Sequence, residues 1–184
     1  MQADPLELAW EAALSLRDLL KFEFFFAEKS RFREQLEGEL ALIDPDWRAR
    51  VACDPAAAEQ LLAPGPLVAH GALRSFIDAQ WIVASELAAL DPRTAIDHER
   101  FLSHCQGIGR QHVLQGRVHG TESVSRELFA SSLKLAANRD VLDPGREDVR
   151  RGRLAWLAEL EQAIAGLRAI RELSERALAG VLKP

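Results

Sequence analysis

The residue types best suited to bind a ligand gather in one polar stretch, GRQHVLQGRVHGTESVSRELF, at positions 109–129. Its cationic and hydroxyl side chains lie close to a predicted helix start: Arg110, Arg117, Ser123, Ser125 and Arg126. Free backbone N–H groups and the helix dipole favour an anion at such a start. The stretch therefore predicts an anion site or a contact with another domain. A structural role stays open, in which Ser and Thr cap the helix and the arginines pair with Glu122 and Glu127.

Four potential metal ligands recur at intervals of seven residues: His98, Cys105, His112 and His119. On one helix a step of seven returns to nearly the same face but advances about 10.5 Å, whereas the ligands of one zinc ion lie roughly 4 Å apart. Adjacent residues such as His104 and Cys105 point in different directions. The spacing argues against a shared ion, and we expect no metal site.

The motifs of enzyme active sites are also missing. Nucleophilic catalysis needs a base within reach of Ser or Cys, and the sequence offers only loose pairings of Cys105 with His104 or His112. The GxSxG, GxxxxGK[ST] and GxGxxG motifs do not occur. A short GxG in QGIGRQ, positions 106–111, lies inside a helical pattern. We therefore expect no catalytic residue and no cofactor.

A different feature is the stretch KFEFFF at positions 21–26, whose four aromatic residues we call the phenylalanine cluster: Phe22, Phe24, Phe25 and Phe26. On a helix these rings would spread over roughly 200° of the surface. So broad an apolar arc needs two or more neighbours or a greasy partner. Acidic and basic residues alternate around it, unlike the Lys/Arg-rich face of a membrane-surface helix. The cluster predicts core, or a seam against another domain.

Composition limits the function classes. The chain has 184 residues, of which 48% are hydrophobic and 28% charged, as in a folded globular protein. Its net charge of -5 argues against a nucleic-acid partner, because such binding depends on neutralising phosphates with Lys and Arg. Cys53 and Cys105 are the only cysteines and form no CxxC pair, so we expect free thiols and a cytoplasmic location.

No targeting or membrane-spanning segment is indicated. The N-terminal stretch MQADPLELAWEAAL carries three acidic residues where a secretion signal would be basic and then apolar. The longest apolar candidate, positions 12–27, contains Arg17, Asp18, Lys21 and Glu23. It falls short of the roughly 18 uncharged residues that a membrane span requires.

The elements that must position these residues are helical, since apolar residues recur at helical spacing almost everywhere and hairpin signals are missing. We expect an all-α fold, a single-domain bundle of about six to seven helices spanning 1–184. Asp4, Asp54 and Asp97 are expected N-caps, and Thr121 or Ser123 is expected to open another helix. The predicted helices cover about 4–26, 30–43, 54–62, 67–90, 97–115, 121–138 and 147–179.

The last predicted helix is the longest and carries one apolar stripe, with Gly180 as its expected C-terminal cap. The stripe fits packing along the bundle. It also fits a two-stranded contact with another chain, so a homo-oligomer is an alternative.

Three long stretches resemble the C-terminal region of the actinobacterial-type glycerol-3-phosphate 1-O-acyltransferases: LRDLLKFEFFFAEKSRFREQLEGELALIDP, FIDAQWIVASELAALDPRT and GRQHVLQGRVHGTESVSRELFASSLKLAANRDVLDPG. The resemblance runs from about Leu16 to Ala165. It implies a helical domain that packs on an acyltransferase domain. In that family an acyl group passes from acyl-CoA or acyl carrier protein to the first hydroxyl of glycerol 3-phosphate at the membrane surface.

The family's catalytic motif is HxxxxD, in which the His acts as a base and the Asp orients it. The residues five positions after the five histidines are Ser75, Ser103, Gly109, Arg117 and Val124, and none is Asp. A phosphate-binding block of FPEG type is missing as well. The resemblance therefore carries no catalytic residue into this chain, which is expected to be inactive alone.

The resemblance predicts a fragment, a split-gene product or a free subunit that meets the catalytic domain in cis or in trans. The phenylalanine cluster would then pack partly inside the domain and partly against the catalytic domain. Peripheral association with the inner face of the plasma membrane would follow through that domain. The alternative is a self-contained helical module that binds an acyl chain or a partner protein.

Overall fold

A computed structural model of the chain describes residues 4–54, 57–61 and 68–181. These residues form α-helices and one short 3-10 helix, with no strand among them, which confirms the predicted all-α class and the long final helix. The chain divides into two compact units, Met1–Val68 with Ile170–Pro184 (unit 1) and Ala69–Ala169 (unit 2), which we describe separately. The single domain over 1–184 stays a prediction.

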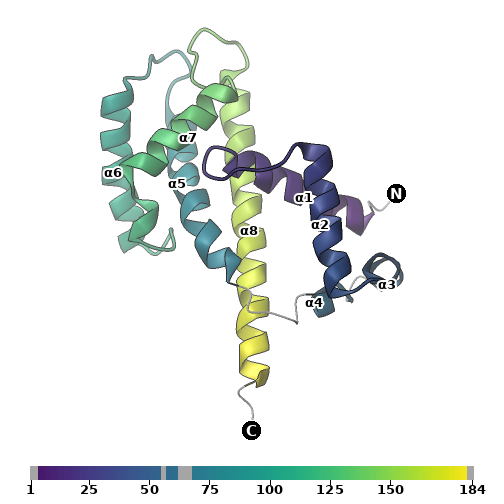
Figure 1. Cartoon of the computed structure of the whole chain (residues 1–184). Coiled ribbons are helices and arrows are strands. Elements are labelled where there is room, and N and C mark those ends of the chain that lie inside the picture. Colours follow the sequence, from purple (N-terminus) through teal and green to yellow (C-terminus); the bar gives the residue numbers. More distant parts are fainter. Residues whose placement is uncertain (1–3, 55–56, 62–67, 182–184) are drawn as a thin grey trace. The chain divides into compact units, whose positions relative to one another are not determined.

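Unit 1 begins with helices α1 (Pro5–Leu20) and α2 (Lys29–Ile43), followed by the shorter α3 (Trp47–Cys53) and α4 (Ala57–Leu61) (Figure 1). Two indoles join α1 to α3, with the ring centroids of Trp10 and Trp47 6.4 Å apart in an edge-on arrangement. The Arg33 guanidinium of α2 lies 4.8 Å from the Trp10 ring and also pairs with Glu7. Aromatic packing and cation–π attraction thus connect the first three helices.

The prediction that the first helix runs through the phenylalanine cluster is wrong. Helix α1 ends at Leu20, whose carbonyl accepts from the N–H groups of Glu23 and Phe24 to close a turn. The Arg17 guanidinium then donates two hydrogen bonds to the Ala27 carbonyl, at 2.7 and 3.2 Å. This tertiary contact turns residues 21–28 into a loop, which we call the aromatic loop. Helical periodicity alone could not reveal it.

Helix α3 was not predicted, because its seven residues are too short for a periodic pattern. Its start is local: Asp44 Oδ1 accepts from the Asp46 N–H at 3.0 Å, and the other Asp44 oxygen pairs with Arg50. Trp47 is buried and anchors the helix. The sequence DPDW, interpreted as a helix stop, is therefore also a helix start.

Unit 2 consists of α5 (Ala69–Ala89), α6 (His98–Leu114), the 3-10 helix η1 (Thr121–Ser123), α7 (Arg126–Asn138) and the first part of α8 (Val149–Val181). Helix α5 contacts α6, η1 and α7, and Figure 1 shows these elements grouped with the N-terminal part of α8. The apolar side chains of their core include Ile77, Ile82, Val83, Leu87, Phe101, Leu102, Phe129, Leu133, Leu135, Val149, Trp156, Leu160 and Leu167.

Helices α6 and α7 end in the same motif, in which a residue of positive φ follows the C-cap. After α6, Gly116 has φ 66°, its N–H donates to the Val113 carbonyl, and the Arg117 N–H donates to the His112 carbonyl. This is the Schellman pattern. After α7, Asp140 takes the positive φ and the buried Val141 closes the second bond. The motifs fix the direction in which the chain leaves each helix.

A buried arginine holds α8 in unit 2. Arg153 Nε donates to the Val141 carbonyl at 2.9 Å, and Nη1 donates to the Leu87 carbonyl at 3.1 Å. Leu87 lies in the last turn of α5, where the helix dipole favours a cation. Burial lowers the pKa of Arg153. One side chain therefore joins α8 to the ends of α5 and α7.

The predicted helix ends are otherwise close to those observed. Asp4 caps α1 and Asp97 caps α6, as predicted, by accepting from Leu6 and Arg100 N–H groups. Two details are wrong. Thr121 and Ser123 form the 3-10 helix η1, while the N-cap of α7 is Ser125, and α8 continues past Gly180 to Val181. No helix in the described part of the chain is long and apolar enough to cross a membrane.

Two glycines, one within α6 and one just after it, should respond oppositely to alanine. Gly107 lies on α6 with open space around its Cα, so Gly107→Ala should stabilise the protein by about 0.5–1 kcal/mol through helix propensity. Gly116 has φ 66°, so Gly116→Ala should destabilise it by about 1–2 kcal/mol through left-handed strain. Denaturant unfolding followed by circular dichroism measures both. Equal effects of the two substitutions would contradict the motif at the end of α6.

Candidate functional site

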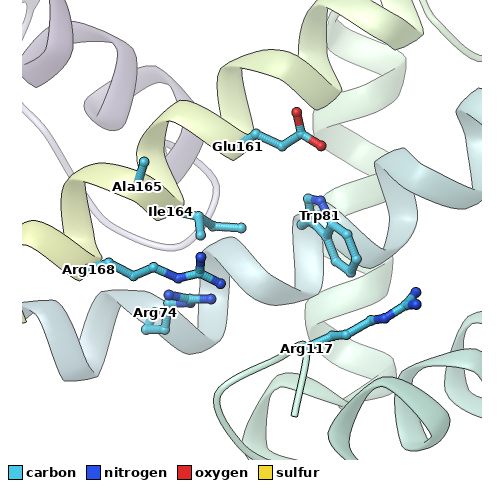
Figure 2. A pocket seen from close by; sticks show the side chains of 7 residues that line it. All are labelled: Arg74, Trp81, Arg117, Glu161, Ile164, Ala165 and Arg168. Carbon is cyan, nitrogen blue, oxygen red and sulfur yellow. The ribbon is translucent and has the colours of Figure 1, made fainter. Parts of the chain in front are cut away.

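The candidate site is a groove in unit 2 with a volume of about 380 Å³. Helix α5, the loop after α6 and helix α8 supply its walls, and the side chains are shown in Figure 2. The groove is lined by Arg74, Trp81, Arg117, Glu161, Ile164, Ala165 and Arg168. Three arginines thus share one concave surface with an indole and short apolar side chains. Such a lining can hold an anion with an apolar part.

A buried carboxylate positions the α5 side of this groove. Asp78 is completely buried, and its Oδ1 accepts from Arg74 Nε at 2.7 Å, one turn earlier on the same helix. Its Oδ2 accepts from the backbone N–H of His119 at 2.6 Å. Hydrogen bonds of this charge-assisted kind are the strong ones in proteins. Asp78 therefore orients the Arg74 guanidinium and also holds the loop that follows α6.

The same loop carries Arg117 into the groove. Gly116 turns the chain at the end of α6, and the anchored His119 lies two residues beyond Arg117. Val118, between them, is buried. The backbone of Arg117 is therefore fixed on both sides, while its guanidinium is exposed.

His112 lies beside the groove and remains neutral near pH 7. Its ring packs against the Trp81 indole with centroids 5.1 Å apart. Burial, together with the charge of Arg117, lowers the pKa of His112. A neutral imidazole adds no second cation next to Arg117. The positive charge of the groove therefore comes from its arginines.

The structure distributes the five sequence-predicted binding residues among different roles. Arg117 lines the groove, and the other four do not. Ser125 caps α7 through the Leu128 N–H and donates to Glu127, while Arg126 pairs with Glu99 of α6. Ser123 is buried in η1, and Arg110 is exposed on α6. Their role in anion binding or in a domain contact stays a prediction.

Sequence reasoning missed the two arginines that accompany Arg117. Arg74 lies on α5 and Arg168 on α8, 43 and 51 residues away along the chain (117 − 74 and 168 − 117). Arg74 carried a weak local signal, since Asp78 follows it at the i,i+4 spacing of a helical ion pair. Nothing in the sequence around Arg168 connects it with the groove.

Cys105 and its neighbour His104 occupy different environments. Cys105 is fully buried on α6, and burial raises the pKa of its thiol to about 12. His104 is exposed and hydrogen-bonds Glu86 at 2.6 Å. No cluster of three or more His, Cys, Asp or Glu able to hold a metal ion occurs within 4–54, 57–61 and 68–181. Cys105 is protonated at neutral pH and is therefore a poor nucleophile.

The two glycines of QGIGRQ lie within α6 rather than at a helix start. A Cβ on Gly109 would come within 3.1 Å of Val124, so this glycine allows the segment after η1 to approach α6 closely. The GxG pattern thus reflects packing at Gly109.

The aromatic loop of unit 1 forms a second candidate surface. Phe26 packs edge-on against Phe32 of α2, with centroids 5.6 Å apart, whereas Phe22, Phe24 and Phe25 are exposed by 44%, 39% and 108%. Arg17 and Lys29 both pair with Asp18 at the base of the loop. Burial raises the pKa of Asp18, but these two cations outweigh it, so that the pKa is lowered. Ion pairs thus hold the base of the aromatic loop, and its phenylalanine rings are exposed.

Known proteins resemble this chain over most of its length. The family profile described as "Glycerol-3-phosphate acyltransferase C-terminal region" matches residues 1–145. Proteins named "Putative acyltransferase plsB1" from Mycobacterium bovis and from two strains of Mycobacterium tuberculosis are 38% identical over 168 residues. That match covers 90% of this chain and 27% of each relative. No solved structure matches the chain.

The described residues form an all-α fold with a cationic groove and an exposed aromatic loop. The chain belongs to the family of glycerol-3-phosphate acyltransferase C-terminal regions, which confirms the resemblance noted in the sequence. It spans about a quarter of the length of the curated relatives that it matches.

The Asp78 contacts predict a coupled loss of stability. Asp78→Ala leaves Arg74 without its buried partner and the His119 N–H without an acceptor, and should cost about 3 kcal/mol or more. The double variant Asp78→Ala/Arg74→Met removes both charges and should cost no more than Asp78→Ala alone. Guanidinium unfolding measures each. Losses that simply add would show that the two side chains do not depend on one another.

Thiol labelling tests the environment of Cys105. Cys53 is exposed, so iodoacetamide should modify one thiol rapidly in the folded protein, and the second only after denaturation. Intact-mass spectrometry counts the modified thiols. Cys53→Ser should abolish the rapid reaction. Rapid labelling of folded Cys53→Ser protein would contradict the buried, protonated thiol.

Proposed function

We propose that this chain is the non-catalytic C-terminal part of a glycerol-3-phosphate 1-O-acyltransferase and works with the catalytic domain of that enzyme. The enzyme transfers an acyl group from acyl-CoA or acyl carrier protein to glycerol 3-phosphate, the first acylation in phospholipid synthesis. The chain supplies a helical surface on which the catalytic domain packs.

Family membership and coverage support this division of labour. The family name refers to a C-terminal region, and each curated relative extends well beyond the segment that the chain matches. None of the five histidines starts an HxxxxD motif, and the one buried thiol is held protonated. The residues present therefore favour binding over acid–base catalysis.

The aromatic loop is the observation that carries the proposal. Phe25 is 108% exposed and the rings of Phe22 and Phe24 are more than a third exposed. Burying a phenylalanine side chain yields about 1.5–3 kcal/mol, so three such rings are a strong drive for association. Aromatic residues are enriched at the centres of protein interfaces. The remaining part of the relatives' length supplies an occupant, the catalytic domain.

Contact with the membrane follows through that partner. The aromatic loop has both signs of charge at its base, in Arg17, Asp18 and Lys29, rather than the basic face of a membrane-surface helix. The chain thus reaches the inner face of the plasma membrane peripherally, with the catalytic domain between them.

Reconstitution in trans tests the proposal. Acyl transfer from palmitoyl-CoA to labelled glycerol 3-phosphate is measured for three samples: this chain, the part of a plsB1 relative that it does not match, and their mixture. The chain alone should be inactive, and the mixture should exceed the catalytic part alone. Phe25→Ser with Phe22→Ser should reduce that gain at least fivefold, because the variant lacks apolar area for docking.

Leu114→Ser is the matched control, since Leu114 is an exposed apolar side chain of unit 2, outside the aromatic loop. It should leave the gain unchanged. Activity of the chain alone would overturn the non-catalytic assignment. A mixture that gains nothing, with a catalytic part shown to be folded, would overturn the docking role.

A further inference from the structure

A second function is suggested by the charge of the groove in unit 2. Its lining holds three arginines, Arg74, Arg117 and Arg168, and one carboxylate, Glu161. The buried Asp78 lies outside the lining and pairs with Arg74. Asp78 offsets Arg74. Neither Arg117 nor Arg168 lies within 4 Å of a carboxylate oxygen of the described residues, whereas Arg126, Arg139 and Arg146 of the same unit do. The groove thus concentrates positive charge in a chain whose net charge is -5.

The arginines approach from three separate elements. Arg74 comes from α5, Arg117 from the loop after α6, and Arg168 from α8, and Figure 2 shows the guanidinium groups of Arg74 and Arg168 extending into the same space. Like charges in one concave site repel each other, and a bound anion relieves this repulsion. Guanidinium forks match the oxygens of phosphate or carboxylate in pairs. The guanidinium groups of Arg74 and Arg168, which lie together in Figure 2, suit the several oxygens of a phosphate, and Arg117, which extends away from this pair, adds positive charge to the same lining.

The remaining lining selects for an organic ligand. Trp81, Ile164 and Ala165 add apolar area beside the arginines, and the volume of about 380 Å³ is that of a small-molecule site. Glu161 supplies an acceptor for a hydroxyl or amine donor on the ligand. We propose that this groove binds the monoester phosphate of a small organic phosphate, either a free phosphate monoester or the monoester headgroup of a phospholipid such as phosphatidic acid.

Two of the groove arginines are positioned without a ligand. One oxygen of the buried Asp78 accepts from Arg74, and the other anchors the loop that carries Arg117. Ordering these groups in advance reduces the entropy cost of binding. The groove lies within unit 2 and the aromatic loop within unit 1, so ligand binding here and docking through the phenylalanines can fail independently.

Titration of the purified chain tests the proposal. Calorimetry with glycerol 3-phosphate probes a free phosphate ester, and cosedimentation with phosphatidylcholine vesicles containing phosphatidic acid probes a headgroup. At least one probe should bind, and binding should weaken as salt rises. Arg117→Gln and Arg168→Gln should each weaken it about fivefold to tenfold, because each removes a charge-assisted contact. Pure phosphatidylcholine vesicles lack the monoester. The unaltered chain should therefore bind them no better than Arg117→Gln or Arg168→Gln binds the vesicles that contain phosphatidic acid.

Arg110→Gln is the matched control. Arg110 is also an exposed arginine of unit 2, but it does not line the groove, so its substitution changes the net charge equally. It should leave binding unchanged, and circular dichroism should show equal folding of all three variants. Binding lost equally in Arg110→Gln would overturn the site. Failure of both probes, or a preference for a glutamate-rich peptide over both, would overturn it as well.

Discussion

The architecture of unit 2 depends on a carboxylate with no exposed surface. Burying an ionised Asp78 is costly unless both oxygens are paired. Here one oxygen takes a guanidinium from its own helix, and the other takes a backbone N–H from 41 residues further along the chain. A hydrophobic residue at this position could fill the volume but could not hold Arg74 or the His119 backbone in place. The need to satisfy one buried charge therefore sets both the loop after α6 and one wall of the groove.

Local signals in the sequence were enough for most helix limits. Asp4 and Asp97 carry capping side chains whose partners lie two or three residues away, so the local sequence identifies them, whereas the N-cap of α7 is Ser125 and not the expected Thr121 or Ser123. The phenylalanine cluster failed for the opposite reason. Its spacing fits a helix, but the Arg17 contact with the Ala27 carbonyl, ten residues away, ends the helix at Leu20. Tertiary contacts overrode a local pattern there.

The groove was predictable only in part, because closeness in sequence is a poor guide to closeness between helices. Arg110, Arg117 and Arg126 occur within 17 residues, yet they lie on α6, on the loop after it and on α7. Arg126 pairs with Glu99, whereas Arg117 lines one groove together with Arg74 and Arg168. What joins those three is the packing of unit 2, through contacts such as Arg153 with Leu87, 66 residues apart. Such contacts leave no periodic trace in the sequence.

The exposed rings of the aromatic loop are held by contacts within unit 1. Lys21 Nζ lies 5.5 Å from the Phe22 ring, and the Arg17 guanidinium lies about as close to Phe26 and Phe32. Cation–π contacts of this kind are worth about 0.5–1 kcal/mol at exposed sites, which is less than a protein interface returns for burying the rings. Because Arg17 also fixes the loop backbone through Ala27, Phe25 is presented from a closed loop. Because the loop is already ordered, covering Phe25 with a partner would cost the loop little conformational entropy. An ordered loop therefore suits the proposed docking better than a frayed helix end would.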